Sequence, residues 1–168
     1  MKKLLILIFT TLFLNSFSYA DKNMKIGSKG SPNEVSRIIK VKMYDNYYEP
    51  SSFTIEAGET IKFEVENVGT LVHEFNIANK MMHIKHQPEM SKMAENGILL
   101  PFSIDKEKMK KMAKMDKSMG HSHSNSVLLE PKQKGEIIWK FVNAVNLEIA
   151  CNVPGHYQAG MIAKVDIN

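Results

Sequence analysis

Three side chains with metal-binding chemistry lie close together near the C-terminus, within residues 151–161. This segment holds the chain's single cysteine, a histidine five positions later and a methionine five positions after that. A thiolate, an imidazole and a thioether suit a copper ion that changes between Cu(I) and Cu(II), because blue-copper sites combine two histidines, one cysteine and a weak axial methionine. Cys151, His156 and Met161 would supply three of these ligands, so a second histidine must come from elsewhere in the chain.

The second histidine is predicted to be His73, at the start of a predicted strand over residues 72–77. A single histidine on a strand is more often a hydrogen-bonded structural residue, and this alternative stays open. The copper interpretation is favoured because His73 follows a turn at residues 67–70 and would lie at one end of a sheet.

Residues 1–20 have the pattern of a secretory signal peptide. Two lysines precede an apolar run over residues 4–14, and Ser18-Tyr19-Ala20 supplies the small residues of a cleavage site. The run is shorter than the roughly 20 residues that a membrane span needs. We therefore expect export to the periplasm, cleavage after Ala20 and no membrane span in the mature protein; an uncleaved N-terminal anchor is the alternative.

Charge and cysteine content limit the functions of the mature chain. Without Lys2 and Lys3, 22 − 2 = 20 basic residues face 18 acidic residues, a net charge of +2 that is too small to indicate a nucleic-acid partner. Exported proteins usually pair their cysteines, so Cys151 is either a buried, unreactive thiol or a functional one. The nearby His156 and Met161 favour the functional thiol.

The chain outside residues 79–125 is predicted to form short strands. Apolar and charged residues alternate most clearly over residues 61–66, and the same period of two occurs over residues 39–43. Further strands are predicted at residues 53–55, 72–77, 127–129, 135–142, 147–151 and 162–167. Short strands separated by turns predict an all-β sandwich of one domain, preceded by a flexible tail over residues 21–35.

These residues resemble the cupredoxin family of small blue-copper proteins. The resemblance covers roughly residues 36–78 and 126–168, and it is most specific over residues 72–75 and 151–161. It implies a Greek-key β-sandwich of about eight strands with copper as its cofactor. The ligands that it implies by position are His73, Cys151 and His156 in the equatorial plane and Met161 on the axis.

Two features depart from the family pattern. In the Cys-x4-His-x4-Met spacing, the segment before the methionine is one residue longer than in azurin-like proteins. The length of the axial bond therefore stays open, and so do the colour and the reduction potential of the copper site. Many electron-transfer members follow the first histidine with an asparagine that ties the ligand loops together, whereas this chain has Glu74. Glu74 either tunes the site, as hydrogen-bonding neighbours of metal ligands do, or points to solvent.

Residues 79–125 interrupt the predicted sandwich and are rich in methionine and histidine. They contain eight of the 12 methionines and four of the six histidines. Thioethers suit Cu(I) and imidazoles suit both oxidation states, so we expect additional copper sites, as the resemblance to exported copper-tolerance cupredoxins of the CopI type also implies. The candidate ligands are Met81, Met82, His83, His86, Met90, His121 and His123.

Two helices are predicted within this insertion, over residues 88–95 and 105–118. The second would place Met109, Met112 and Met115 on one face. The alternative to copper binding is that this methionine face packs against the rest of the protein.

Two functions stay open. The first is a periplasmic type 1 copper protein in copper tolerance, which binds excess copper, oxidises Cu(I) or passes copper to a transporter or chaperone. The second is a soluble single-domain electron carrier between exported redox partners. The insertion favours the first, because a plain carrier does not need it. An enzyme is not expected, since copper oxidases and nitrite reductases couple this kind of site to a further catalytic copper centre; weak cuprous oxidase activity is the remaining enzymatic alternative.

Overall fold

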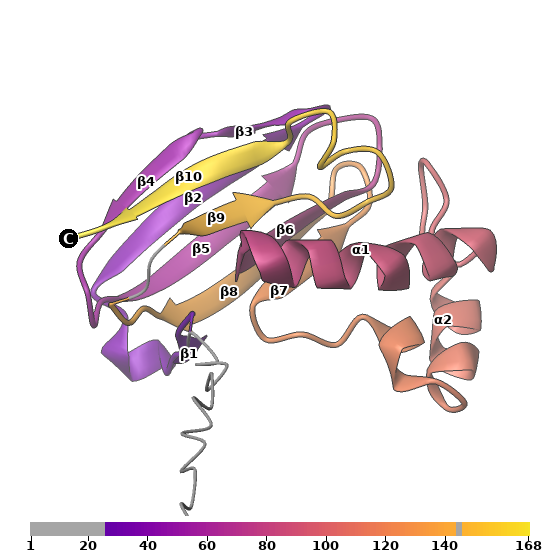
Figure 1. Ribbon diagram of the computed structural model, residues 1–168, viewed down its shortest axis with the longest axis horizontal. Helices are drawn as coiled ribbons and strands as arrows, with labels where there is room; N and C mark the ends of the chain where they lie inside the picture. The colour runs from indigo at the N-terminus through magenta and orange to yellow at the C-terminus, as the bar shows by residue number, and fades with distance from the viewer. Residues whose placement is uncertain (1–25, 144–145) are drawn as a thin grey trace, which may run out of the picture.

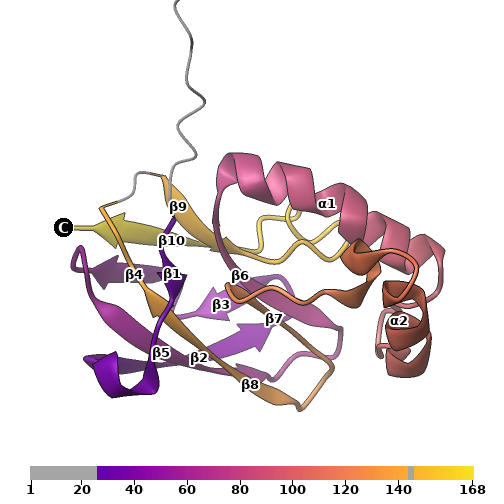
Figure 2. The ribbon, with the colours of Figure 1, turned by 90° about the horizontal axis from the view of Figure 1, so that it is seen from below.

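Two stacked β-sheets and a pair of helices make up the computed structural model, which describes residues 26–143 and 146–168. The predicted signal peptide and the first residues of the predicted tail lie outside these ranges. Helix α1 (Lys80–Glu95) packs beside β6 and β9 and extends past one end of the sandwich, where α2 (Lys106–Ala113) lies (Figure 1 and Figure 2). Neither of these helices, nor any other helix within the described ranges, is long and apolar enough to cross a membrane.

The first sheet has the strand order β1-β8-β5-β2-β3. Its strands are β1 (Ser28–Lys29), β2 (Arg37–Tyr44), β3 (Tyr47–Glu49), β5 (Thr60–Asn67) and β8 (Lys134–Lys140). β2 pairs in parallel with β5, and β5 pairs antiparallel with β8. On β5 the side chains of Ile61, Phe63 and Val65 point inward and are at most 1% exposed, which confirms the predicted alternation.

The second sheet has the order β4-β10-β9-β6-β7 and holds the strands that matter for the site. They are β4 (Ser52–Ile55), β6 (His73–Asn79), β7 (Ser126–Leu129), β9 (Leu147–Ala150) and β10 (Ile162–Ile167). β6 and β9 are antiparallel, with Asn76 opposite Ala150. Because of this register, the start of β6 and the end of β9 lie at the same rim of the sandwich.

The core between the sheets is closed by aromatic residues from both of them. Phe63 of β5 and Phe75 of β6 have ring centroids 5.2 Å apart, and Tyr48 of β3 packs edge-on against Phe75 at 6.0 Å. The Tyr48 hydroxyl donates a hydrogen bond to the carbonyl of Glu74. Phe75 therefore anchors β6 directly behind the two residues at its start, His73 and Glu74.

Over residues 26–143 and 146–168 the sandwich has ten strands, where the family resemblance implied about eight. The additional strands are short: β1 has two residues and β3 has three. β1 pairs with β8, the 3-10 helix η1 (Pro32–Glu34) follows, and Ile26 is buried. Regular structure thus begins before Arg37, in a polar segment where two residues are too few to display a strand period.

Helix α1 begins at Lys80, ahead of the predicted start at residue 88. The side chain of Asn79 caps it by accepting a hydrogen bond from the Met82 N–H at 2.9 Å. Pro88 lies inside the helix; because proline is favoured in a first turn, it misplaced the predicted start. The predicted end was right, since the chain leaves the helix at Asn96 and Gly97, whose φ is +64°.

The second predicted helix, over residues 105–118, is shorter and broken in two. α2 is capped by Asp105 and ends at Ala113, and a 3-10 helix η2 (Lys117–Gly120) follows. Met109 and Met112 pack against the core, whereas Met115 is 78% exposed. The packing interpretation of this methionine face is therefore confirmed for the first two residues and wrong for Met115.

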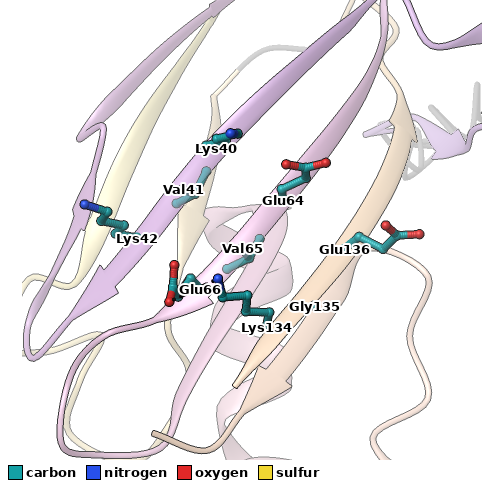
Figure 3. A pocket seen from close by; sticks show the side chains of 9 residues that line it. All are labelled: Lys40, Val41, Lys42, Glu64, Val65, Glu66, Lys134, Gly135 and Glu136. Carbon is teal, nitrogen blue, oxygen red and sulfur yellow. Dashed lines mark ion pairs between the residues drawn. The ribbon is translucent and has the colours of Figure 1, made fainter. Parts of the chain in front are cut away.

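A hollow of about 490 Å³ on the outer face of the first sheet is lined by charged residues of β2, β5 and β8 (Figure 3). Lysines and glutamates alternate there, and Lys134 and Glu66 form an ion pair at 3.4 Å. None of the residues that line it is a predicted copper ligand. We interpret it as a solvated sheet surface.

Candidate metal centre

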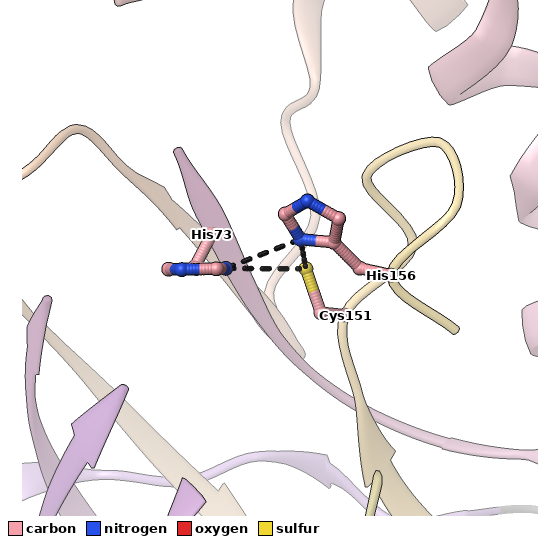
Figure 4. A group of neighbouring side chains, drawn as sticks. All are labelled: His73, Cys151 and His156. Atoms are coloured by element: carbon pink, nitrogen blue, oxygen red, sulfur yellow. Dashed lines mark hydrogen bonds between the residues drawn. The ribbon is translucent and has the colours of Figure 1, made fainter. Parts of the chain in front are cut away.

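Three of the four predicted copper ligands converge at one end of the sandwich (Figure 4). His73 starts β6, Cys151 follows β9, and His156 lies in the loop between β9 and β10. The Cys151 Sγ lies 3.3 Å from His156 Nδ1 and 3.9 Å from His73 Nδ1, and the two Nδ1 atoms are 3.2 Å apart. We call these three residues the thiolate group; one thiol and two imidazoles form the trigonal set of a type 1 copper site.

The loop between β9 and β10 closes on itself and returns to Cys151. The Cys151 N–H donates to the Met161 carbonyl at 3.2 Å, and the Met161 N–H donates to the His156 carbonyl at 3.0 Å. Gly155 and Gly160 have φ near +90°, a conformation that favours glycine. Met161 is fully buried beside Cys151 despite the longer spacing; its role as axial ligand stays a prediction.

His73 is oriented by Asp45, which sequence reasoning did not identify. The His73 Nε2 lies 2.8 Å from Asp45 Oδ1, so the ring proton belongs on Nε2 and the lone pair of Nδ1 faces Cys151. Asp45 also accepts hydrogen bonds from the main-chain N–H and the hydroxyl of Thr70. Burial opposes the charge of Asp45, but the hydrogen bonds from His73 and Thr70 hold its pKa well below the usual value.

Burial disfavours the charged forms of all three side chains of the thiolate group. Burial lowers the pKa values of His73 and His156 and raises the pKa of Cys151 to about 12. A metal ion bound here would therefore meet two neutral imidazoles and displace one proton from the thiol. The donors present fit copper, which when bound would supply one-electron chemistry.

A second group of histidines brings together α1 and the segment that leads into β7. One ring nitrogen from each of His86, His121 and His123 lies within 4.8 Å of the others. We call these three residues the histidine group. They are three of the seven candidates proposed from the sequence of the insertion.

Glu74 contacts both groups and is fully buried, so the alternative that it points to solvent is wrong. Its Oε1 lies 3.1 Å from His86 Nε2 and 2.7 Å from His121 Nε2. Its Oε2 accepts hydrogen bonds from the main-chain N–H and the side-chain amide of Asn152, and its own N–H donates to Cys151 Sγ at 3.3 Å. Burial would raise the pKa of Glu74, but the contacts with His121 and His86 hold it well below the usual value.

The other four candidates of the insertion lie outside the histidine group. The His83 ring is fully buried, with Nδ1 against the Asn152 amide at 3.1 Å and Nε2 3.4 Å from the Glu148 carbonyl. Met90 is buried in the core, whereas Met81 and Met82 are exposed. Copper binding by these four side chains stays a prediction.

Comparison with known proteins places the chain in a family. The cupredoxin-like domain family matches residues 4–95, more than half of the chain. The copper-resistant cuproprotein CopI of Pseudomonas aeruginosa is 42% identical over 84% of this chain and 81% of its own length, and that of Rubrivivax gelatinosus is 29% identical over 86% of this chain and 74% of its own. The structure of auracyanin B, at 14% identity, superposes with a TM-score of 0.59 over 84% of this chain and 96% of its own, which shows a shared fold.

The family match ends at residue 95, before Cys151, so the arrangement of the ligands rests on the geometry described above. The fold, the family match and the relatives agree, and the Greek-key sandwich and the copper cofactor implied by the resemblance are both supported. The chain therefore belongs to the cupredoxin family, with copper as its cofactor and CopI copper-resistance proteins among its relatives.

Proposed function

We propose that this protein is an exported, periplasmic copper-tolerance protein. It holds copper at His73, Cys151, His156 and Met161, cycles between Cu(I) and Cu(II), and binds further copper through the insertion at residues 79–125. The observation that carries the proposal is that two convergent donor groups occur in one small domain, the second supplied by the insertion. A plain electron carrier needs only the first.

The thiolate group suits repeated oxidation and reduction. Sulfur donors favour Cu(I), and imidazoles serve both oxidation states. Two strand ends, a closed loop and the Asp45–His73 contact hold the donors in one arrangement. Because Cys151 and Met161 are fully buried, the residues also keep water away from the sulfur side of the site.

Copper loading of the purified protein tests the first part of the proposal. We expect the wild-type protein to bind more than one equivalent of copper and to show a strong thiolate-to-copper absorption band in the Cu(II) form. Cys151→Ser should lose the band and retain the remaining copper. A wild-type protein without this band, or with a single copper that Cys151→Ser removes entirely, would contradict it.

Growth of a copper-sensitive bacterium tests the role in tolerance. Expression of the full chain should raise the copper concentration that the host survives, and the protein recovered from the periplasm should begin at Asp21. Cys151→Ser, produced at the same level, is the matched control and should protect less. Equal growth with both chains would exclude a role of the thiolate group in tolerance.

Electron transfer between exported redox partners is the second candidate function. It is favoured by the thiolate group, whose three donor atoms all lie within 4.8 Å of one another. Rapid electron exchange between the reduced protein and an exported cytochrome or oxidase, with no effect on copper survival, would select this function over copper tolerance.

A further inference from the structure

We propose that Glu74 connects the thiolate group to a second metal site, where its carboxylate and the histidine group bind a divalent cation of the Cu(II) or Zn(II) kind. Occupancy of this second site would then change the reduction potential at Cys151. The inference rests on the proposed function and deepens it: it takes copper as the ion at the thiolate group, and it names the donors and the class of ion of the second site.

The donors of the second site differ in kind from those of the first. Three imidazole nitrogens and one carboxylate oxygen form an N3O set, which suits borderline divalent cations. Glu74 Oε1 stands between two of the imidazoles, at 3.1 Å and 2.7 Å from their Nε2 atoms. The three ring centroids lie 5.1 to 5.5 Å from one another, so all three rings surround one small volume.

Neighbouring residues hold these donors in place as they do in metal sites. Glu89 Oε2 lies 2.9 Å from His86 Nδ1, which leaves His86 Nε2 directed at Glu74. Carboxylates in this position commonly orient metal-binding histidines. The Asn76 amide donates to Glu74 Oε1 at 3.0 Å and fixes that carboxylate. The donors of the site are therefore oriented, and the Glu89 carboxylate contacts the ring nitrogen of His86 that faces away from Glu74.

An ion can reach the histidine group from solvent. A hollow of about 280 Å³ is lined by Met82, His86, Glu89 and His123, among others, and His123 is exposed. The thiolate group lies on the other side of Glu74, which is buried. A cation that enters through this hollow would meet the histidine group before it could reach Cys151.

Glu74 gives a short structural connection between the two sites. Its main-chain N–H donates to Cys151 Sγ, and its Oε2 accepts from the main-chain N–H of Asn152, the next residue. A divalent cation at Oε1 adds positive charge close to the thiolate group. Since reduced copper carries one positive charge fewer, this charge favours Cu(I). By linkage, the cation must then bind more tightly to the Cu(I) form by the same factor.

The test uses the full-length mature protein with one equivalent of copper, which shows the thiolate band in its Cu(II) form. Zn(II), which is redox-silent, is titrated by calorimetry into the Cu(II) form and, without oxygen, into the Cu(I) form. We expect one Zn(II) to bind, at least about fivefold more tightly to the Cu(I) form, and the reduction potential to rise on Zn(II) addition.

Variants locate the site. His123→Ala should lose Zn(II) affinity at least about tenfold, and Glu89→Gln should lose about 10- to 100-fold; both should keep the thiolate band. Ile84→Ala, at an exposed position of the same helix outside the histidine group, is the matched control and should keep the wild-type affinity. Glu74→Gln should weaken Zn(II) binding and remove the difference between the two copper forms.

Two results would overturn the inference: equal Zn(II) affinity in His123→Ala and wild type, or equal affinity for the Cu(I) and Cu(II) forms of the wild type. The thiolate band measured before Zn(II) addition separates this inference from the proposed function. A protein with the band but no response to Zn(II) contradicts only the inference, whereas a protein without the band contradicts the proposed function.

Discussion

Asp45 and Glu74 show how residues next to the ligands define the copper centre. Asp45 fixes the ring of His73 through Nε2, and the Glu74 N–H donates to Cys151 Sγ. Hydrogen bonds of this kind orient ligands and tune their basicity. The thiolate group is therefore supported by the Asp45 carboxylate and by the main chain at Glu74.

Removal of the Asp45 side chain should weaken copper binding. Asp45→Ala frees the His73 ring, and we expect copper affinity at the thiolate group to fall by about 10- to 100-fold. Competition with a chromophoric chelator measures the affinity. Asp166→Asn, an exposed position on β10, is the control; equal affinity in both variants would show that Asp45 does not support the ligand.

The candidate ligands were named from the sequence, as was Glu74 as one of two alternatives, whereas Asp45 was not. Cys151, His156 and Met161 lie in one short segment, and His73 stands at a recognisable strand start. Glu74 acquires its role from the β6–β9 register, which brings it level with Asn152. Asp45 acquires its role because the turn after β2 lies against Thr70. Such contacts between distant segments have no signature in local sequence.

At the scale of elements, α1 is both a structural helix and a source of candidate metal donors. Met90 and Met93 are fully buried in the core, and His86 contacts Glu74 on β6. Gln87 also bonds to Gln158 in the loop between β9 and β10 at 2.9 Å. The helix thereby joins the insertion to the sandwich.

Shortening a buried side chain of α1 should destabilise the whole domain. Met90→Ala removes a fully buried side chain, and we expect the free energy of unfolding to fall by about 2 to 5 kcal/mol. Met81→Ala, on the exposed face of the same helix, should change it by less than about 0.5 kcal/mol. Chemical denaturation of both variants measures the difference. If Met90→Ala lowered the free energy of unfolding no more than Met81→Ala does, the insertion would not be part of the core.

Elements with a long apolar alternation were predictable, and those without it were not. On β5 every second side chain from Ile61 to Val65 is apolar and buried, and the predicted strand is confirmed. β1 is too short to show any period. The start of α1 was missed because Asn79 caps it without an acidic residue in the first turn, whereas Pro88 offered a stronger but misleading signal.

For the molecule as a whole, we expect copper binding and folding to be coupled. The thiolate group draws His73 from one strand and Cys151 and His156 from the β9–β10 connection, so it exists only when the second sheet is formed. An ion that binds the folded state alone stabilises it in proportion to the logarithm of its concentration over Kd.

Copper should therefore raise the thermal unfolding temperature. Free copper at about 100 times Kd corresponds to about 2.7 kcal/mol of added stability. We expect the unfolding temperature of the wild type to rise when copper is added and to fall back to the value of the copper-free protein when a chelator is added. Cys151→Ser should show a smaller rise. An equal rise in both proteins would place the stabilising ion outside the thiolate group.

The dual contact of Glu74 also constrains how this family can diverge. A carboxylate buried at this position is tolerable only where hydrogen-bonding partners compensate for the lost water, and here His86 and His121 are two of those partners. A relative that loses the insertion loses these partners and should exchange the carboxylate for a neutral residue. The four positions 74, 86, 121 and 123 are therefore expected to be inherited or lost together, as one heritable unit.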